Sequence, residues 1–202
     1  MTAVDSNSTG QLLVNYARSA TTNYLNMFGY GDYSGNARIA TVKFTGIENL
    51  DISGSALVNG PDLIIARGQG TYDGKGGTDT IVADLSTAST PVVFVAGEGR
   101  NSTAAGSTFS NFERMVLLTG SDSDGVDTSS FALNDYLVLG AGGDIARTGG
   151  GSDTIDAGAG DDDVTVLVDG SDVIEGGDGT DRLTIDASKF NHSGYGRIWW
   201  EG

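Results

Sequence analysis

Cysteine is absent from the 202 residues of this chain, and histidine occurs once, at His192. The lack of cysteine excludes disulfide bonds, thiolate zinc sites and a cysteine nucleophile, and it leaves the redox compartment undecided. A Ser-His-Asp arrangement would depend on His192, but no nucleophile-elbow sequence accompanies it. No HExxH segment is present for a zinc protease either. We therefore expect that the chain is not an enzyme.

Basic residues and long apolar runs are also scarce. The chain has 11 Lys and Arg against 27 Asp and Glu, which gives a formal net charge of −16. Such an acidic chain is not expected to bind nucleic acid, because that affinity comes from basic contacts. No apolar run approaches the roughly 18 residues of a membrane span, so membrane insertion is not expected. The first residues, MTAVDSNSTGQLLV, also lack the basic and apolar regions of a signal peptide.

Glycine and acidic residues are abundant, and the acidic ones are concentrated in one region. The chain has 32 glycines and only 2 prolines. Residues 120–186 contain 16 acidic and 2 basic residues, a net charge of −14. Self-repulsion of this size opposes a compact state unless cations neutralise it. The charge distribution therefore predicts that folding is coupled to divalent metal ions.

Aspartates recur every nine residues in the segment 134–186. They stand at Asp135, Asp144, Asp153 and Asp162, then, after one inserted residue, at Asp172 and Asp181. A small or aliphatic residue follows two positions later each time: Leu137, Ala146, Ile155, Val164, Ile174 and Leu183. A six-residue turn and a three-residue strand make half a coil, so 18 residues close one coil of a flattened solenoid. The aliphatic residues then point inward and stack at the strand spacing of about 4.8 Å.

This pattern resembles the RTX (repeats-in-toxin) nonapeptide GGxGxDxUx, or hemolysin-type calcium-binding repeat, in which U is a large aliphatic residue. The resemblance implies an all-β fold, a right-handed parallel β-roll or β-solenoid with Ca²⁺-binding glycine-rich turns. It also implies several Ca²⁺ ions, each between two turns on the same edge, one coil apart. The turns would pair through Asp144 with Asp162, Asp153 with Asp172, and Asp162 with Asp181. Backbone carbonyls and carboxylates are the oxygen ligands that Ca²⁺ prefers.

The metal ligands that the resemblance implies are the aspartates of these turns and the residues whose carbonyls precede them. They are Gly140, Gly142, Asp144, Thr148, Gly149, Gly150, Gly151, Asp153, Ala157, Gly158, Ala159, Gly160, Asp162, Gly170, Asp172, Gly176, Gly177, Asp178, Gly179 and Asp181. Asp135 follows SFALN without a glycine and is a weaker candidate. The alternative, a solvated acidic linker, would not keep a fixed aliphatic period.

A longer internal repeat surrounds the nonapeptides. Segments 12–17, 81–86 and 183–188 each predict an opening strand, and segments 44–54 and 109–120 match one another. We interpret residues 1–80 as a first β-solenoid unit with a degenerate turn pair and residues 81–182 as a second unit. The full nonapeptide array lies at 134–182, and residues 183–202 begin a third unit. Residues 18–41 and 87–108 are interpreted as further strands and loops that widen the solenoid, TPVVFVAG being the clearest strand.

The first unit contains two shortened turns of the same kind. Gly60 and Asp62 mark one, and Gly77 and Asp79 mark the other. The aspartates are 17 apart, one short of a coil, so we expect one calcium ion between these turns.

Two glutamates, Glu48 and Glu113, recur in the matching segments 44–54 and 109–120. One interpretation is a catalytic acid. The other, which we favour, is a carboxylate that accepts hydrogen bonds at a corner between coils, because a repeated structural position rarely carries a single active site. Trp199 and Trp200 are open to two interpretations, sugar stacking or filling of the next coil.

These observations favour a calcium-binding structural module of a secreted or cell-surface bacterial protein, such as an adhesin exported by type I secretion, that folds on Ca²⁺ outside the cell. Its partners would be neighbouring domains of a longer parent chain, with a glycan or other cell-surface ligand as a further candidate. The C-terminal GYGRIWWEG does not resemble a type I signal, so we expect an excised piece. The alternative is a polysaccharide-acting enzyme or carbohydrate-binding accessory module on a parallel β-helix, by fold analogy alone.

Overall fold

The computed structural model describes residues 12–18, 23–29, 38–44, 50–53, 62–66, 69–96, 102–104 and 106–189. Every regular element in these ranges is a β-strand, which confirms the all-β prediction. Accordingly, the described part of the chain contains no helix with the length and apolarity needed to cross a membrane.

The structure assigns 18 strands to these ranges. They are β1 (Leu12–Arg18), β2 (Asn23–Gly29), β3 (Arg38–Phe44), β4 (Leu50–Ser53), β5 (Leu63–Ala66), β6 (Gly70–Asp73), β7 (Thr80–Asp84), β8 (Val93–Val95), β9 (Ser102–Ala104), β10 (Ser107–Ser110), β11 (Arg114–Leu118), β12 (Gly125–Thr128), β13 (Tyr136–Val138), β14 (Ile145–Thr148), β15 (Thr154–Asp156), β16 (Asp163–Leu167), β17 (Val173–Glu175) and β18 (Arg182–Asp186).

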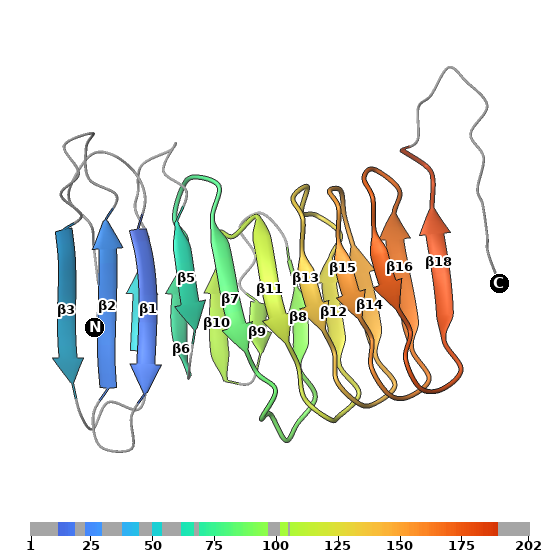
Figure 1. The fold of residues 1–202 in the computed structure, drawn as a ribbon, viewed down its shortest axis with the longest axis horizontal. Coiled ribbons are helices and arrows are strands. Elements are labelled where there is room, and N and C mark those ends of the chain that lie inside the picture. Colours follow the sequence, from blue (N-terminus) through green and yellow to red (C-terminus); the bar gives the residue numbers. More distant parts are fainter. Residues whose placement is uncertain are drawn as a thin grey trace.

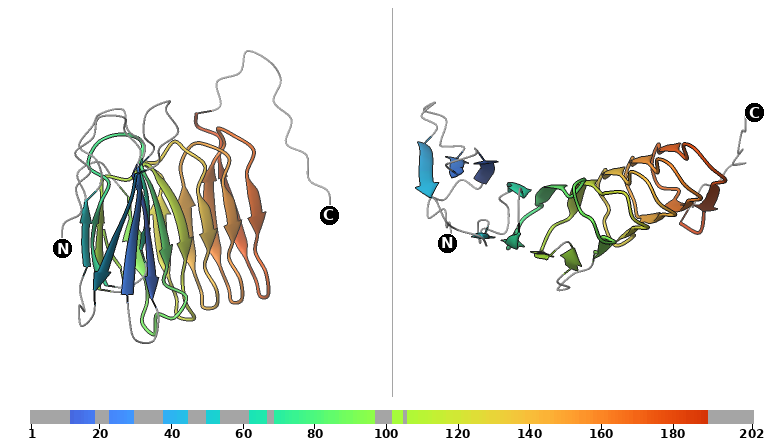
Figure 2. Two further views of the ribbon diagram at one scale, coloured as in Figure 1. Left: turned by 60° about the vertical axis from the view of Figure 1, so that its left-hand side comes forward. Right: turned by 90° about the horizontal axis from the view of Figure 1, so that it is seen from below.

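The strands form two layers of a parallel roll (Figure 1). One layer is a nine-stranded sheet in the order β17-β15-β13-β11-β7-β5-β1-β2-β3. The second layer is a four-stranded sheet, β4-β6-β10-β9, toward the N-terminal end and a five-stranded sheet, β18-β16-β14-β12-β8, toward the C-terminal end (Figure 2). From β11 onward, successive strands belong alternately to the two layers. Each strand pairs in parallel with the next strand of its own layer. The parallel β-roll architecture is therefore confirmed.

The register between coils follows the predicted period. Tyr136 pairs with Thr154, and Ile145 pairs with Asp163, each 18 residues further along the chain. After the inserted residue the offset becomes 19, as in the pairing of Thr154 with Val173. The turn between β16 and β17 absorbs the insertion, and the strands on either side stay aligned.

The aliphatic residues two positions after each aspartate build the core, as predicted. Leu137, Ala146 and Ile155 are 0% exposed and Val164 is 2% exposed, whereas Leu183 in β18 is 49% exposed. Each inward position thus covers its equivalent in the next coil, and apolar burial of this kind stabilises the roll by about 25 cal/mol per Å².

The N-terminal strands depart from the coil pattern. β1 pairs in parallel with β5, but β1, β2 and β3 pair with one another in antiparallel fashion. Residues 18–41 therefore contribute strands, as expected, but these extend the nine-stranded sheet sideways. The reason is the connection length: only residues 19–22 separate β1 from β2, and a parallel pairing needs a crossover of a dozen residues or more.

Candidate metal centre

The aspartates stand immediately before the strands, in two rows. One row precedes strands of the nine-stranded sheet: Asp62, Asp79, Asp135, Asp153 and Asp172. The other precedes strands of the five-stranded sheet: Asp124, Asp144, Asp162 and Asp181. Strands of the two layers run in opposite directions, as β7 and β18 show in Figure 1. The two rows therefore line opposite edges of the roll.

Within each row, one carboxylate oxygen of an aspartate accepts a hydrogen bond from a backbone N–H of the preceding coil. Oδ1 of Asp162 accepts the N–H of Asp144 at 2.8 Å, and Oδ1 of Asp181 accepts that of Asp162 at 3.1 Å. On the other edge, Oδ1 of Asp172 accepts the N–H of Asp153 at 3.0 Å. These hydrogen bonds place side by side the three pairs of turns that the resemblance implied.

In five of the aspartates of these rows, the second carboxylate oxygen is buried and has no hydrogen-bond partner. Within the described ranges, Oδ2 has no hydrogen-bond partner in Asp79, Asp135, Asp144, Asp153 and Asp162. None of these residues is more than 3% exposed. A buried carboxylate without a partner is costly, so it takes up a proton or binds a cation.

Burial raises the pKa of these carboxyl groups when no metal is present. The pKa rises to about 7 for Asp79 and Asp135 and to about 6 for Asp144, chiefly because burial disfavours the charged form. Burial also raises the pKa of Asp153. The hydrogen bonds from backbone N–H groups act in the opposite direction and offset part of this effect. Near neutral pH, the carboxyl groups of Asp79 and Asp135 are therefore partly protonated when no metal is present.

These raised pKa values predict opposite pH responses with and without calcium. In the unfolded chain the aspartate pKa is about 3.9, so protonation favours the folded state. That stabilisation is complete below about pH 4 and is lost as the pH rises through 6 to 7. In chelator, the folded fraction of the chain, measured by its β signal, should therefore be higher at pH 5 than at pH 8, whereas the apparent calcium affinity should be lower at pH 5. The β signal in chelator and a calcium titration at both pH values would test this, and a chelated chain with a higher folded fraction at pH 8 would contradict it.

The glycine-rich turns before Asp144, Asp162 and Asp181 stack directly on one another. Ala159 forms parallel bridges with Ala141 on one side and with Asp178 on the other. The carbonyl oxygen of Gly140 accepts the N–H of Ala159, and that of Gly158 accepts the N–H of Asp178, both at 2.9 Å. The carbonyl oxygens of this edge are thus gathered between neighbouring turns.

Gly160 shows why glycine is required in this stack. Its φ of 141° lies in a region that side-chain-bearing residues rarely adopt. A Cβ at this position would also overlap the carbonyl oxygen of Gly142 in the turn before. The absence of a side chain therefore lets a carbonyl of one coil reach the next coil.

The opposite edge is built in a related way. The N–H of Ser171 donates to Oγ of Ser152 at 3.0 Å, and a Cβ at Gly170 would overlap the carbonyl oxygen of Gly151. Thr148, at the end of β14, is buried, and Gly149 and Gly150 follow it. The turn with the inserted residue thus stays against its neighbour.

The donor set of these turns suits calcium. In the described part of the chain, no three His, Asp or Glu side chains gather where they could hold one metal ion. An ion here would therefore need backbone carbonyl oxygens beside one or two aspartates, a mixture that Ca²⁺ accepts. The unsatisfied Oδ2 atoms and the closely approaching carbonyls meet that requirement. The ion would supply the positive charge that the buried carboxylates lack.

The structure also places the predicted ligands of the first unit. Asp62 and Asp79 are neighbours across one coil, since the N–H of Asp62 donates to Oδ1 of Asp79 at 2.8 Å. Gly77 lies in the turn before Asp79 and has a φ of 142°. Gly60 lies outside the described residues, and so does Glu48.

Three further acidic residues accept backbone hydrogen bonds in the same way: Asp124 and Glu113, which the sequence did not single out as ligands, and Asp135, which it gave as a weaker candidate. Oδ1 of Asp124 accepts the N–H of Val92 at 2.7 Å, and Oδ1 of Asp135 accepts that of Met115 at 2.8 Å. Oε2 of Glu113 accepts the N–H of Asp79 at 2.7 Å, so the structural interpretation of this glutamate is confirmed. For Asp124 the available signal was Val126, the aliphatic residue two positions later.

Together, the stacked coils, the buried carboxylates and the carbonyl-rich turns define a class: parallel β-rolls whose turns bind metal ions. The comparison with protein families is more specific. Residues 131–165 and 168–185 match the family model of the RTX calcium-binding nonapeptide repeat, in four copies. This part of the chain is an array of RTX repeats, as the sequence predicted. No curated protein and no solved structure matched the chain.

Proposed function

We propose that this chain is a calcium-dependent structural module of a secreted or cell-surface protein, and that its roll becomes stable when Ca²⁺ fills the turns outside the cell. One observation carries the proposal: the RTX repeats hold buried carboxylate oxygens without partners, and their glycine turns lie close against carbonyl oxygens of the neighbouring coil. Where calcium is scarce the chain would stay loose, a state suited to export. Where calcium is abundant, binding to the folded state alone stabilises that state by mass action.

The shape of the roll supports a scaffolding role. Each coil adds one strand to each layer, so the described strands stand in rows along one axis (Figure 1). Such an array separates whatever is attached at its two ends. The partners would then be neighbouring domains of a longer surface protein, for example an adhesin exported by type I secretion.

Asp162→Asn provides the sharpest test of calcium binding. Asn keeps an oxygen for the N–H of Asp144 but removes the charge of the unsatisfied Oδ2. We expect the variant to bind fewer Ca²⁺ ions per chain and to lose about 2–3 kcal/mol of calcium-dependent stability, which is one site at 100 times its dissociation constant. In chelator its folded fraction should equal or exceed that of the wild type, because Asn resembles a protonated Asp.

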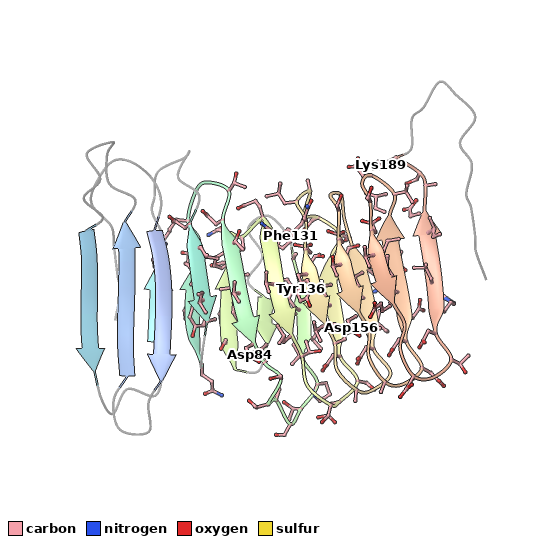
Figure 3. The ribbon with its side chains drawn as sticks, in the orientation of Figure 1. Asp84, Phe131, Tyr136, Asp156 and Lys189 are labelled. Atoms are coloured by element: carbon pink, nitrogen blue, oxygen red, sulfur yellow. The ribbon has the colours of Figure 1, made fainter. Side chains whose placement is uncertain are left out.

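Asp156→Asn is the matched control for this substitution. Asp156 lies at the end of β15, in the nine-stranded sheet (Figure 3), and is only half-buried. Bound calcium, measured by equilibrium dialysis with elemental analysis, should be the same in the control and the wild type. If Asp162→Asn also retained the full number of ions and the full calcium-dependent stability, the proposal would be wrong.

A further inference from the structure

A turn outside the matched repeats has the backbone of a repeat turn. Residues 74–79, GKGGTD, align with residues 176–181, GGDGTD. Lys75 and Gly77 have φ values of 73° and 142°, and the equivalent Gly177 and Gly179 have values of 98° and 137°. Lys75 therefore adopts a left-handed conformation that costs a non-glycine residue energy and that the repeats assign to glycine.

The carboxylate of this turn is aimed as in the repeats. A Cβ at Gly74 would lie 2.8 Å from Oδ2 of Asp79, just as one at Gly176 would lie 2.5 Å from Oδ2 of Asp181. The same Cβ at Gly74 would overlap the carbonyl oxygen of Asn111. A carboxylate oxygen and a carbonyl oxygen thus converge on one place. Asp79 is 0% exposed, and its Oδ2 has no hydrogen-bond partner among the described residues.

The corner 111–113, between β10 and β11, faces this turn from the following coil. The N–H of Asp79 donates to Oε2 of Glu113 at 2.7 Å, and the N–H of Glu113 donates to the carbonyl oxygen of Asp79 at 3.1 Å. Glu113 therefore occupies the place that the next aspartate occupies in the repeats. The turn ending at Asp62, which the sequence suggested as the partner, lies on the other side of Asp79, where the N–H of Asp62 donates to Oδ1 of Asp79.

Lys75, the basic residue of the turn 74–79, forms an ion pair with Asp73. Nζ of Lys75 lies 2.5 Å from Oδ2 of Asp73. Oδ1 of the same aspartate accepts hydrogen bonds from Nδ2 of Asn111 at 2.7 Å and from the N–H of Lys75 at 3.0 Å. The ammonium group thus neutralises Asp73, and the carboxylates of Asp79 and Glu113 are left to bind a further cation.

We propose that the turn 74–79 and the corner 111–113 form a calcium site of their own, outside the RTX repeats, with Asp79, Glu113 and the carbonyl oxygen of Asn111 as ligands. The site rests on the proposed function and extends it to the region where the second layer changes from the four-stranded to the five-stranded sheet. Asp79 and Glu113 are 34 residues apart, nearly twice the separation in the repeats. An ion here would help to close this long coil, because the entropy cost of closure rises with the length of the segment that is closed.

Hydrogen exchange of the full chain, followed by mass spectrometry with and without Ca²⁺, tests the site. In the wild type, calcium should slow exchange of the amides in 74–79 and 111–113 on the order of tenfold or more. Glu113→Gln keeps an oxygen for the N–H of Asp79 but removes the charge. It should abolish this protection while leaving that of 139–181 intact. Glu175→Gln, an exposed glutamate on β17, is the matched control and should behave as the wild type does.

Lys75→Gly provides an independent variant with the opposite expectation. It removes the ammonium group and the left-handed strain together, so the calcium concentration that half-protects 74–79 should fall by about threefold or more. An unchanged or higher midpoint would overturn the site. So would wild-type protection confined to 139–181, or protection of 74–79 that survives Glu113→Gln. If calcium protected no part of the chain, the proposed function would fail as well.

Discussion

Chelation of calcium is expected to abolish the cooperative thermal transition of this chain near neutral pH. Residues 120–186 carry a net charge of −14, and without calcium ions this charge opposes the compact fold. A site held at 100 times its dissociation constant contributes about 2.7 kcal/mol. Three such sites, one for each pair of turns, would contribute about 8 kcal/mol, as much as the entire stability of many domains.

The measurement is far-UV circular dichroism with thermal melting, first in EDTA and then during a calcium titration. We expect the β signal to appear cooperatively with Ca²⁺ but not with Mg²⁺, because Mg²⁺ demands a rigid octahedron and releases its waters reluctantly. A chain that is fully folded in EDTA would show that the stacked aliphatic residues suffice. The coupling of folding to metal would then be wrong.

Gly160→Ala is expected to be among the most damaging single substitutions in the roll. The new Cβ would overlap the carbonyl oxygen of Gly142, and the residue would have to keep a φ of 141°. Strain and overlap together should cost about 3 kcal/mol or more. Because the displaced carbonyl belongs to the turn edge that would hold calcium, the apparent calcium affinity should fall as well.

Gly125→Ala is the control for this substitution. Gly125 begins β12, and a Cβ there meets nothing within 4 Å. Its substitution should change stability by less than about 0.5 kcal/mol, with a small gain possible from the stiffer unfolded chain. Thermal melting of both variants in excess calcium makes the comparison. Equal melting temperatures would mean that the turns yield more easily than their packing indicates.

The architecture of the roll was predictable because each nonapeptide fixes two things at once. An aspartate marks the start of a strand, and the aliphatic residue two positions later marks its inward face, so Leu137 and Ile155 had to stack. This logic held through the inserted residue before Asp172, because the turn could absorb it. It is a local rule, and it applies wherever the spacing between aspartates stays near nine.

The sequence was less informative where the spacing changes. Asp124 stands 11 residues before Asp135 and 20 before Asp144. The nine-residue period therefore did not identify Asp124 as a member of the carboxylate rows. Glu113 fills an aspartate position from a coil with a 34-residue separation, which no local pattern shows. The meander of β1, β2 and β3 depended on short connections and not on side-chain periodicity. In each case the missing information was long-range pairing.

The hydrogen bonds of the carboxylate rows give the roll a direction. Each Oδ1 serves the backbone of the coil before it, from Asp79 back to Asp62 and from Asp181 back to Asp162. The backbone N–H of each coil is therefore satisfied only when the following coil forms, and every new turn covers the turn before it. The coils are therefore expected to fold one after another along the roll. A chain shortened from the C-terminal side would lose the coil that was removed and also loosen the coil exposed in its place.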